Sequence, residues 1–507
     1  MATSFKKRVL IFIPAYHAET TIASVLRRIP ASLIDLYEVD VLIIDDSSRD
    51  LTFARSHEAA RQAGIPFDVR VLFNPVNQGY GGNQKIGYRY AIERGYDYVA
   101  LLHGDGQYAP ECLPELLGAF SEGDPAAVYG SRMLTKAGAL KGGMPLYKFV
   151  GNKILTWTQN RLLRSNLSEF HSGYRLYSVD ALRTVPFERN SNDFHFDTEI
   201  IIQLMFFAKR EIRELPIPTY YGDEICRVNG MSYALNVILS TLKARFQELG
   251  IFYDRRYDCA PVALEHYTPK FEYPSTHSMA FELVPEHSRV LDLGCAGGYM
   301  AAALKAGKGC YVTGVDAFPL EEDVKLDEFY LRDLNEGLHG IPVAGQDVVL
   351  MLDVIEHLAS PERFLDQLHQ SLARNPGAQV VISTANIGFI IPRLMLMIGQ
   401  FNYGKRGILD VTHTRLFTFS SFRRCLEQGG FDVVEMRAVP GPFPLALGDT
   451  WFSRLLLRLD QALIHVSRGL FGYQIFARIK PRPTVASLLE AAHEESDRKV
   501  RALESVL

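Results

Sequence analysis

Polar side chains follow four predicted strands in the first half of the sequence, at the points where those strands end. Carboxylate, amide and imidazole groups can hold Mg²⁺ or Mn²⁺, and such a metal bridges the phosphates of a nucleotide diphosphate. A glycine-rich loop lets the backbone approach a ligand closely. We therefore predict a metal and nucleotide site that contains Pro14, Tyr16, Glu19, Asp45, Asp46, Gly79, His103, Asp105, Gln107 and Arg132.

Each of these features has a simpler structural explanation when it is taken alone. A pair such as Asp45 and Asp46 at a strand end caps a helix more often than it binds a ligand, and one glycine-rich loop is weak support for a site. The features follow one another along the chain, each at a strand end. Because the carboxyl ends of parallel strands meet at one edge of a sheet, this order favours a ligand site.

A second constellation begins where a predicted strand runs into a glycine-rich turn and a helix, at residues 290–298. Asp292, Gly294 and Gly298 lie in this segment, and Asp316 closes the next strand 24 positions after Asp292. Such a turn brings backbone N–H groups toward a ligand, and a carboxylate at this spacing can accept bonds from ribose hydroxyls. NAD is the rival ligand, but its fingerprint needs a glycine where Ala296 stands.

Two imidazoles in the second half are placed to act as a base. His357 follows the predicted strand 348–352 and Asp353, and for this histidine the simpler interpretation is a polar tie between a strand end and a helix. His413 lies in a polar loop between Asp410 and Arg415, and here we favour a role in removing a proton from a substrate hydroxyl.

These residues require two sheets to position them. Apolar β-branched runs predict strands at residues 9–13, 41–44, 69–73, 98–102, 289–293, 311–315, 348–352 and 380–383. Helical patterns separate the strands, which predicts an α/β fold class with two Rossmann-like domains, the first with a parallel, doubly wound sheet. The predicted divisions are a first domain at 1–250, a linker at 251–273, a second domain at 274–480 and a charged helix at 481–507.

Composition excludes several classes of function. The chain has 507 residues, of which 47% are hydrophobic and 22% charged, so full cores are expected, and its net charge of -4 does not favour nucleic acid as a partner. Six cysteines without a close pair fit a reducing cytoplasm. The apolar stretches are too short to span a membrane. Residues 387–398 and 451–463 are amphipathic, and a core or interface role is the default, with peripheral contact at the inner membrane face left open.

The first half resembles family 2 glycosyltransferases, in the branch of dolichol-phosphate mannosyltransferase and polyprenyl-phosphate glucosyltransferases. The resemblance covers about residues 8–245 and implies a GT-A type fold. The matching segments are residues 13–16, 44–48, 77–79, 105–110, 130–132 and 173–177, together with Arg227, Gly230 and Ser232.

This resemblance implies roles for individual residues. Asp105 and Gln107 would hold the metal, with His103 in place of the family's usual first Asp. The implied substrate contacts are Pro14, Tyr16, Glu19, Asp45, Asp46 and Gly79 around the nucleotide sugar, and Arg132, Arg175, Arg227 and Ser232 near phosphates or the acceptor. The family inverts the anomeric centre, so an acceptor hydroxyl would need a base, for which Asp197 or Glu199 is the candidate. These two acids equally suit capping of the helix that follows, and a polyprenyl phosphate acceptor needs no base.

The second half resembles class I S-adenosylmethionine-dependent methyltransferases over about residues 270–480. The matching segments are residues 290–298, 332–334, 347–358 and 407–418. The resemblance implies S-adenosylmethionine as the cofactor, with His357, Asp410 and Arg415 toward the methyl acceptor and His413 as the base. The implied cofactor contacts are Asp292, Gly294, Gly298, Asp316, Asp333 and Asp353.

The two resemblances together predict a bifunctional cytoplasmic enzyme. One half would transfer a sugar from a nucleotide-sugar donor to a polyprenyl phosphate or glycan acceptor, and the other would methylate a glycan or related small molecule. Two alternatives stay open. The second half could be a regulatory module that binds cofactor without turnover, or the first half could be a glycan-binding module beside an active methyltransferase.

Overall fold

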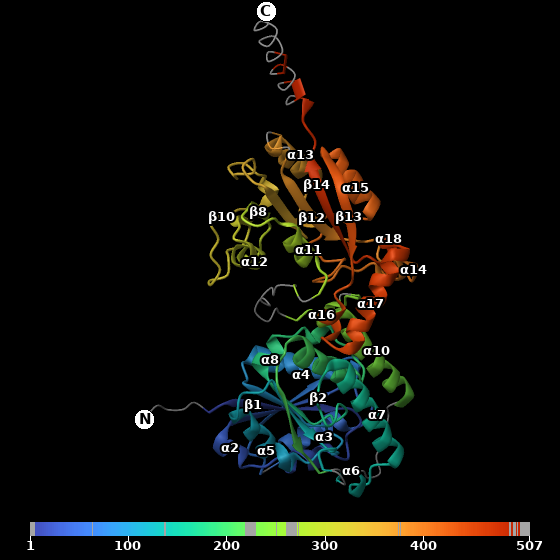
Figure 1. The fold of residues 1–507 in the computed structure, drawn as a ribbon. Helices are drawn as coiled ribbons and strands as arrows, with labels where there is room; N and C mark the ends of the chain where they lie inside the picture. Colours follow the sequence, from blue (N-terminus) through green and yellow to red (C-terminus); the bar gives the residue numbers. More distant parts are fainter. Residues whose placement is uncertain are drawn as a thin grey trace, which may run out of the picture. The chain divides into compact units, whose positions relative to one another are not determined.

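The computed structural model describes residues 6–62, 64–135, 138–218, 230–249, 251–259, 271, 273–373, 375, 377–485, 488, 489, 493, 495 and 496. These residues form two compact units, one of Met1–Glu248 with Asp254–Leu264 and one of Leu249–Tyr253 with Glu265–Leu507. Each unit is built around one seven-stranded sheet (Figure 1). Most of the helix predicted for 481–507, and residues 260–270 and 272 of the predicted linker, lie outside the described residues.

The first unit has the strand order β3-β2-β1-β4-β6-β5-β7. Its strands are β1 (Arg8–Ala15), β2 (Glu38–Asp45), β3 (Asp68–Phe73), β4 (Tyr98–Leu101), β5 (Ala127–Ser131), β6 (Arg175–Ser178) and β7 (Ile212–Pro216). Its helices are α1 (Ile22–Arg27), α2 (Leu33–Leu36), α3 (Thr52–Ala60), α4 (Gly79–Arg94), α5 (Leu113–Gly118), α6 (Gly138–Lys141), α7 (Leu146–Leu163), α8 (Val179–Arg183), α9 (Phe196–Ile201) and α10 (Gly230–Glu248). Single turns complete it at η1 (Pro110–Cys112), η2 (Ala119–Ser121), η3 (Phe187–Arg189), η4 (Ile202–Phe207) and η5 (Arg255–Tyr257).

The central strands of this unit are buried on both faces, which explains their continuous apolar sequences. Along β1, Leu10 and Phe12 join one core with side chains of α4, α8 and α9, whereas Val9 and Ile11 join the other core with α1 and α5. Figure 1 shows α4 and α8 on one side of β1 and β2, with α2, α3 and α5 on the other. This arrangement fixes the carboxyl ends of β1, β2 and β4 side by side.

The second unit has the strand order β10-β9-β8-β11-β12-β14-β13. Its strands are β8 (Arg289–Leu293), β9 (Tyr311–Asp316), β10 (Glu328–Leu331), β11 (Val348–Leu352), β12 (Gln379–Ala385), β13 (Phe431–Val439) and β14 (Gln474–Pro481). Its helices are α11 (Thr276–Leu283), α12 (Tyr299–Lys308), α13 (Pro361–Leu372), α14 (Ile390–Met397), α15 (Phe419–Gln428), α16 (Phe443–Leu447), α17 (Trp451–Val466) and α18 (Arg468–Phe471), with turns η6 (Leu334–Glu336) and η7 (Ile355–His357). Side chains of α13 and α15 pack in one core of the sheet and those of α11 and α12 in the other.

The predicted α/β fold class is confirmed, and all eight predicted strands are present. The prediction of a parallel sheet in the first domain was wrong, because both sheets are mixed. The strand β6 is antiparallel to both β4 and β5, and β14 is antiparallel to β12 and β13. Hydrophobic periodicity indicates that a strand exists but not its direction. Within the described residues, none of the helices has the length and apolar character needed to cross a membrane.

Candidate functional site

In the first unit, the acids at the ends of β1 and β2 mainly hold the chain's own loops. Asp46 accepts hydrogen bonds from the backbone N–H of Gln78 (2.8 Å) and Gly79 (3.0 Å) and from the Asn74 side chain. Glu19 accepts one from the backbone N–H of Leu51 (2.9 Å). These two predicted substrate contacts therefore shape the site, and direct contact with a ligand stays a prediction for them.

Asp45 differs from its neighbour because one of its oxygens has no partner. Its Oδ1 accepts a bond from the Ser48 N–H at 2.9 Å in the turn after β2, and α3 begins only at Thr52 with no side-chain cap. Its Oδ2 is buried and accepts no hydrogen bond from the described residues. A buried carboxylate oxygen in this state is available to a donor group of a ligand, such as a base N–H or a hydroxyl. Pro14 and the half-exposed Tyr16 continue β1 beside it.

The glycines at the start of α4 serve packing against the chain itself. Gly79 has a φ of 78°, and a Cβ there would lie 2.8 Å from the carbonyl oxygen of Asn192. The N–H of Gly81 donates to the same carbonyl at 2.7 Å. The close approach that requires glycine is therefore to residues 191–193, and this contact fixes the loop that Asp46 holds.

The predicted metal ligands follow β4. Asp105 is exposed, and Gly106, with a φ of 76°, turns the chain toward the half-buried Gln107, whose N–H donates to Asp105 Oδ1 at 3.1 Å. Among the described residues, no three His, Cys, Asp or Glu side chains group closely enough to hold a metal by themselves. Mg²⁺ commonly uses one or two protein oxygens together with substrate phosphates, so Asp105 and Gln107 fit such an ion.

His103 is turned toward a buried polar network instead. Tyr80 donates to Asp197 Oδ2 at 2.9 Å, and its hydroxyl lies 3.3 Å from His103 Nε2, so the tyrosine oxygen can accept the Nε2 proton. Burial lowers the pKa of His103, against the opposing charges of Asp105 and Asp197. Tyr80 is a residue that the sequence analysis missed, since it lies one position after Gly79 inside a helical pattern.

The two candidate bases lie in different surroundings. Asp197 accepts bonds from Tyr80 and, at 3.3 Å, from Gln84, and its carboxylate is 3.6 Å from the Arg175 guanidinium. Glu199 is fully buried, accepts a bond from the Ser191 N–H at 2.6 Å and pairs with Arg256. Glu199 therefore supports the loop at 191–193 from behind.

Arg175 is also fully buried, so its predicted role as a direct substrate contact does not fit this geometry. It donates to the carbonyl oxygens of Phe170, Ser172 and Asp197 at 2.7–2.8 Å. A guanidinium that is surrounded in this way positions Asp197 and cannot reach a ligand without breaking these bonds.

Arg132 has a buried counter-ion and a partly exposed side chain. It pairs with Glu169 and donates to the carbonyl oxygen of His171 at 3.1 Å, while Asn152 donates to Glu169 at 2.8 Å. Burial alone would raise the pKa of Glu169, but the Arg132 guanidinium outweighs it and the pKa lies below its ordinary value. Of the other predicted phosphate contacts, Ser232 is exposed at the start of α10, and Arg227 lies outside the described residues.

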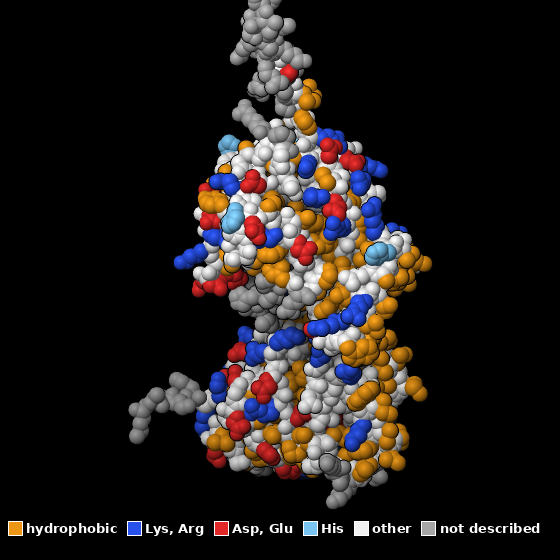
Figure 2. Space-filling model, in the orientation of Figure 1, with side chains coloured by type: hydrophobic (Ala, Val, Ile, Leu, Met, Phe, Trp, Pro, Cys, Tyr) orange, Lys and Arg blue, Asp and Glu red, His pale blue; other side chains and the backbone are white. Residues whose placement is uncertain are grey.

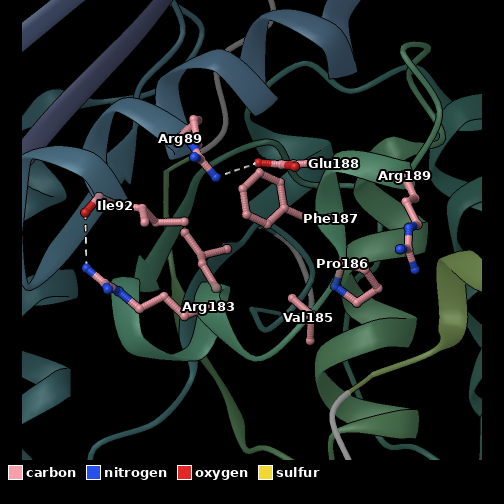
Figure 3. Close-up of a pocket in the computed structure, with 9 residues that line it drawn as sticks. Arg89, Ile92, Arg183, Val185, Pro186, Phe187, Glu188 and Arg189 are labelled. Atoms are coloured by element: carbon pink, nitrogen blue, oxygen red, sulfur yellow. Dashed lines mark hydrogen bonds and ion pairs between the residues drawn. The ribbon is translucent and has the colours of Figure 1, made fainter.

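A separate pocket of the first unit, of about 310 Å³, lies away from these residues (Figure 3). It contains Arg89, Arg183 and Arg189, and Arg89 is ten residues beyond Gly79, which is about 15 Å along α4. Each guanidinium is already bonded within the chain: Arg89 to Glu188, Arg183 to the Ile92 carbonyl and Arg189 to the Arg255 carbonyl. We therefore do not place the donor there.

In the second unit, the glycine-rich turn forms one wall of a cavity of about 200 Å³. The cavity is lined by His277, Asp292, Gly294, Cys295, Ala296, Tyr299, Met300, Leu352, Asp353, Val354 and His357. Ala296, Gly294 and Gly298 have φ values of 48°, 76° and 85°, which turn the chain from β8 into α12. Ala296 has a left-handed conformation that glycine would adopt more easily. Alanine at this position therefore adds backbone strain, and the turn is still formed.

The two acids at the ends of β8 and β9 have different roles. Asp316 accepts a hydrogen bond from the N–H of Ala296 at 2.7 Å and one from the N–H of Phe318 at 2.9 Å, so it holds the turn in place. Its contact with ribose hydroxyls stays a prediction. Asp292 is buried and its Oδ2 has no hydrogen-bond partner among the described residues. Burial, with a contribution from the charge of Asp316, raises the pKa of Asp292 to about 7.

Asp353 lines the cavity in a left-handed conformation, with a φ of 57°. Its carboxylate accepts bonds from Gln474 (2.6 Å) and Ser383 (2.7 Å), which tie β11 to β14 and β12. Asp333 is exposed and caps η6 by accepting the Asn335 N–H at 2.9 Å. It is not among the residues that line the cavity, and its adenine contact stays a prediction.

The two predicted imidazoles lie together, and of the two His357 lines the cavity whereas His413 is not among the lining residues. The rings of His357 and His413 are 4.7 Å apart, and His413 Nδ1 is bonded to the Ile408 carbonyl at 2.9 Å. Burial lowers the pKa of His413, which keeps the imidazole neutral and able to accept a proton. Asp410 accepts a hydrogen bond from the Thr412 N–H at 2.9 Å within the loop, and Arg415 donates one to Glu362 of α13 at 3.0 Å.

Three further residues of this unit were missed by the sequence analysis. His277 and Tyr299 are bonded to each other and line the cavity. Glu356 is buried, its Oε2 has no partner among the residues that the structure describes, and burial together with the nearby Asp353 raises its pKa to about 8. Tyr299 directly follows Gly298, and this position after the turn could have identified it. Nothing in the local sequence marks His277, which belongs to α11, a helix outside the turn.

Comparisons with known proteins agree with this division. A family model described as "Glycosyl transferase family 2" matches residues 10–185, and one described as "Methyltransferase domain" matches residues 265–436. An undecaprenyl-phosphate mannosyltransferase of Micrococcus luteus is 32% identical over 215 residues, which cover 41% of this chain and 82% of that protein. The mitochondrial ubiquinone biosynthesis O-methyltransferase of Schizosaccharomyces pombe is 28% identical over 152 residues, covering 28% of this chain and 52% of that protein.

Among solved structures, one similar chain is a glucosyl-3-phosphoglycerate synthase from Mycobacterium tuberculosis, in complex with Mn²⁺, uridine diphosphate and phosphoglyceric acid. The TM-score is 0.37 at 17% sequence identity, and the match covers 47% of this chain and 78% of that one.

Proposed function

Because the chain belongs to the family 2 glycosyltransferases and carries a methyltransferase domain, we propose that it is one bifunctional enzyme with two independent ligand sites. One observation carries the proposal. At the carboxyl edge of each sheet lies a buried carboxylate oxygen that has no hydrogen-bond partner in the described part of the chain, Asp45 Oδ2 in the first unit and Asp292 Oδ2 in the second. An unpaired buried acceptor is costly, and a ligand that donates to it recovers that free energy.

In the first unit, the donor is a nucleotide sugar. Asp45 accepts a hydrogen bond from its nucleoside, and the loop at Gly79 that Asp46 holds lies beside the diphosphate. Asp105 and Gln107 hold Mg²⁺ or Mn²⁺, which neutralises charge on the diphosphate leaving group. The imidazole of His103 is bonded to Tyr80. His103 therefore either makes no contact with this metal or is a weak third ligand of it.

The acceptor is a polyprenyl phosphate, and the state of the candidate bases supports this choice over a glycan hydroxyl. Both oxygens of Asp197 already accept hydrogen bonds, and Glu199 is enclosed by Ser191 and Arg256. A phosphate oxygen attacks without losing a proton, so it needs no free carboxylate. Arg132, paired with a buried carboxylate but partly exposed, suits the acceptor phosphate.

In the second unit, S-adenosylmethionine is the methyl donor. Its ammonium or hydroxyl groups bond the free oxygen of Asp292, and Asp316 takes the ribose. His413, kept neutral by burial, removes the proton of an acceptor hydroxyl on a glycan or a related small molecule. Both co-substrates are cytoplasmic metabolites, so we place the enzyme in the cytoplasm with a peripheral contact to the membrane that contains the acceptor.

Transfer assays test the acceptor class directly. The full chain with Mn²⁺ and a panel of radiolabelled nucleotide sugars should label undecaprenyl phosphate and leave undecaprenol unlabelled. Labelling of undecaprenol or of a free glycan, with no labelling of undecaprenyl phosphate, would refute the lipid-phosphate acceptor. The reaction would then need a base to remove the proton of the acceptor hydroxyl.

A further inference from the structure

The outer sides of α7 and α10 form an exposed apolar surface, called here the α7/α10 face. Its members are Leu146, Tyr147, Val150, Ile154 and Trp157 of α7 and Met231, Leu235 and Leu239 of α10. Trp157 is 70% exposed, Tyr147 75% and Met231 84%. Soluble surfaces scatter large apolar residues singly, so a group of eight on two helices marks a surface that binds something.

The spacing of these residues is that of a single stripe on each helix. At 100° per residue, the five positions of α7 fall within an arc of about 100°, and residues 231, 235 and 239 of α10 follow an i, i+4, i+8 pattern. The two helices pack against each other. Figure 2 shows hydrophobic side chains gathered along the edge of the molecule that α7 and α10 form in Figure 1, with Lys and Arg among them.

The charges on α7 and on the chain segments that flank it are all of one sign. Between Asp124 and Glu169 the sequence contains no acidic residue, whereas Lys and Arg recur through it. Lys148, Lys153 and Arg161 lie on α7 itself, and Arg164 caps its end. An apolar stripe that contains Trp and Tyr, on a helix whose charged residues are all cations, is complementary to the interface of an anionic bilayer.

The inner sides of the same two helices hold the candidate acceptor-phosphate residues. Asn152 of α7 donates to Glu169, the counter-ion of Arg132. Tyr233 of α10 is bonded to His171 Nδ1 at 2.8 Å, and the His171 carbonyl accepts a bond from Arg132. Each helix therefore connects the outer apolar stripe to the surroundings of Arg132 across one helix diameter, about 10 Å.

We propose that the α7/α10 face docks on an anionic lipid surface and so brings Arg132 to the phosphate of a membrane-embedded acceptor. The docking itself is independent of the catalytic assignment, and only the delivery of the acceptor rests on the proposed function. The face is distinct from the amphipathic stretches at 387–398 and 451–463, which belong to the other unit.

Vesicle flotation of the full chain tests the docking without any donor or acceptor present. The wild-type chain should float with vesicles of phosphatidylcholine and phosphatidylglycerol and float poorly with phosphatidylcholine alone. Replacing Ile154 and Trp157 with Ser should lower partitioning at least about tenfold, because their apolar area no longer enters the bilayer. Replacing Lys148 and Lys153 with Gln should lower binding to the anionic vesicles about fivefold for each charge.

The matched control replaces Trp451 and Leu459 of α17, two similarly exposed apolar residues, with Ser. This variant should float like the wild type, and thermal unfolding should show every variant folded. The proposal is overturned if the wild type does not float, if the α17 variant loses as much binding as the α7 variant, or if light scattering shows a dimer that only the α7 variant dissociates. A chain that floats but labels no polyprenyl phosphate would refute the acceptor assignment and leave the docking intact.

Discussion

Both units hold a loop with one acid, Asp46 or Asp316, and the units differ in their remaining acids. Both also bury an acid, Asp45 or Asp292, with one oxygen that has no partner among the described residues. In the first unit, Asp46 and Glu19 are bonded to the backbone of neighbouring loops, and Asp105 is exposed. In the second unit, Asp292 and Glu356 are buried with free oxygens and raised pKa values. The first site thus offers a preformed loop and an accessible carboxylate for a metal, whereas the second offers a desolvated carboxyl for a small cationic cofactor.

The largest expected effect is the loss of sugar transfer on removal of Asp105. Asp105→Ala should lower the transfer rate about a thousandfold, because the diphosphate leaving group loses the metal that neutralises it. The control is Asp68→Ala, which removes an exposed acid at the first residue of β3, at the edge of the sheet opposite to the carboxyl ends of the parallel strands. Its transfer rate should equal that of the wild type. Equal activity of Asp105→Ala at saturating Mn²⁺ would contradict the assignment.

A smaller effect is expected for the cofactor of the second unit. Asp316→Ala should weaken S-adenosylhomocysteine binding about a hundredfold, since two charge-assisted hydrogen bonds to ribose are lost. Asp347→Ala removes an acid that accepts the Arg289 N–H at the other end of β8, and should leave the affinity unchanged. Equal affinities for the wild type and Asp316→Ala, measured by calorimetry, would remove Asp316 from the site.

The pH dependence of stability should separate the two units. Because the pKa of Asp292 is raised from 3.8 to about 7, the folded state holds a proton that the unfolded chain has released. Unfolding then releases a proton between about pH 4 and 7, so this contribution to stability is present below pH 4 and is lost as the pH rises toward 7. The expected loss is of order 1–4 kcal/mol, and Asp292→Asn should remove it.

Thermal unfolding followed at several pH values measures this effect. The expected result is a transition of the second unit whose midpoint falls from pH 5 to pH 8 in the wild type and falls less in Asp292→Asn, where the raised pKa of Glu356 still contributes. Identical pH profiles for the two proteins would show that Asp292 is ionised and solvated.

The smallest effect concerns the glycine loop of the first unit. Gly79→Ala places a Cβ 2.8 Å from the Asn192 carbonyl, whereas Gly95→Ala, at a similar φ of 68°, meets no atom within 4 Å. Both variants should lose about 1 kcal/mol of stability from the left-handed backbone. Only Gly79→Ala should also weaken nucleoside diphosphate binding, about tenfold, because its loop must move. Equal binding by both variants would show that the loop does not contact the nucleotide.

The sequence predicts the central strands and the residues at their ends well, because a continuous apolar run followed by polar residues is a local signal. It does not predict what those residues contact. Asp46 holds the loop at Gly79, and the loop packs against Asn192 more than a hundred positions later, which no local pattern contains. The direction of β6, the burial of Arg175 and the pairing of Glu199 with Arg256 likewise depend on contacts between distant segments.

Three residues that the sequence analysis did not single out, Tyr80, Glu169 and His277, each act through a partner on another segment, whereas Tyr299 has a local signal in its position after Gly298. Tyr80 lies between His103 and Asp197, Glu169 holds Arg132, and His277 holds Tyr299. A polar side chain in a helical pattern has no signature of its own when its partner is on another element. Such positioning residues emerge only when the fold brings the elements together.

The central claim is that one chain contains two independent ligand sites, and calorimetry on the full chain tests it most directly. The account predicts that a nucleoside diphosphate with Mn²⁺ binds the wild type and Asp316→Ala but not Asp105→Ala. It predicts that S-adenosylhomocysteine binds the wild type and Asp105→Ala with equal affinity, binds Asp316→Ala far more weakly, and that NAD gives no heat. Binding of NAD with no heat from S-adenosylhomocysteine, or loss of both ligands through either single substitution, would contradict the account.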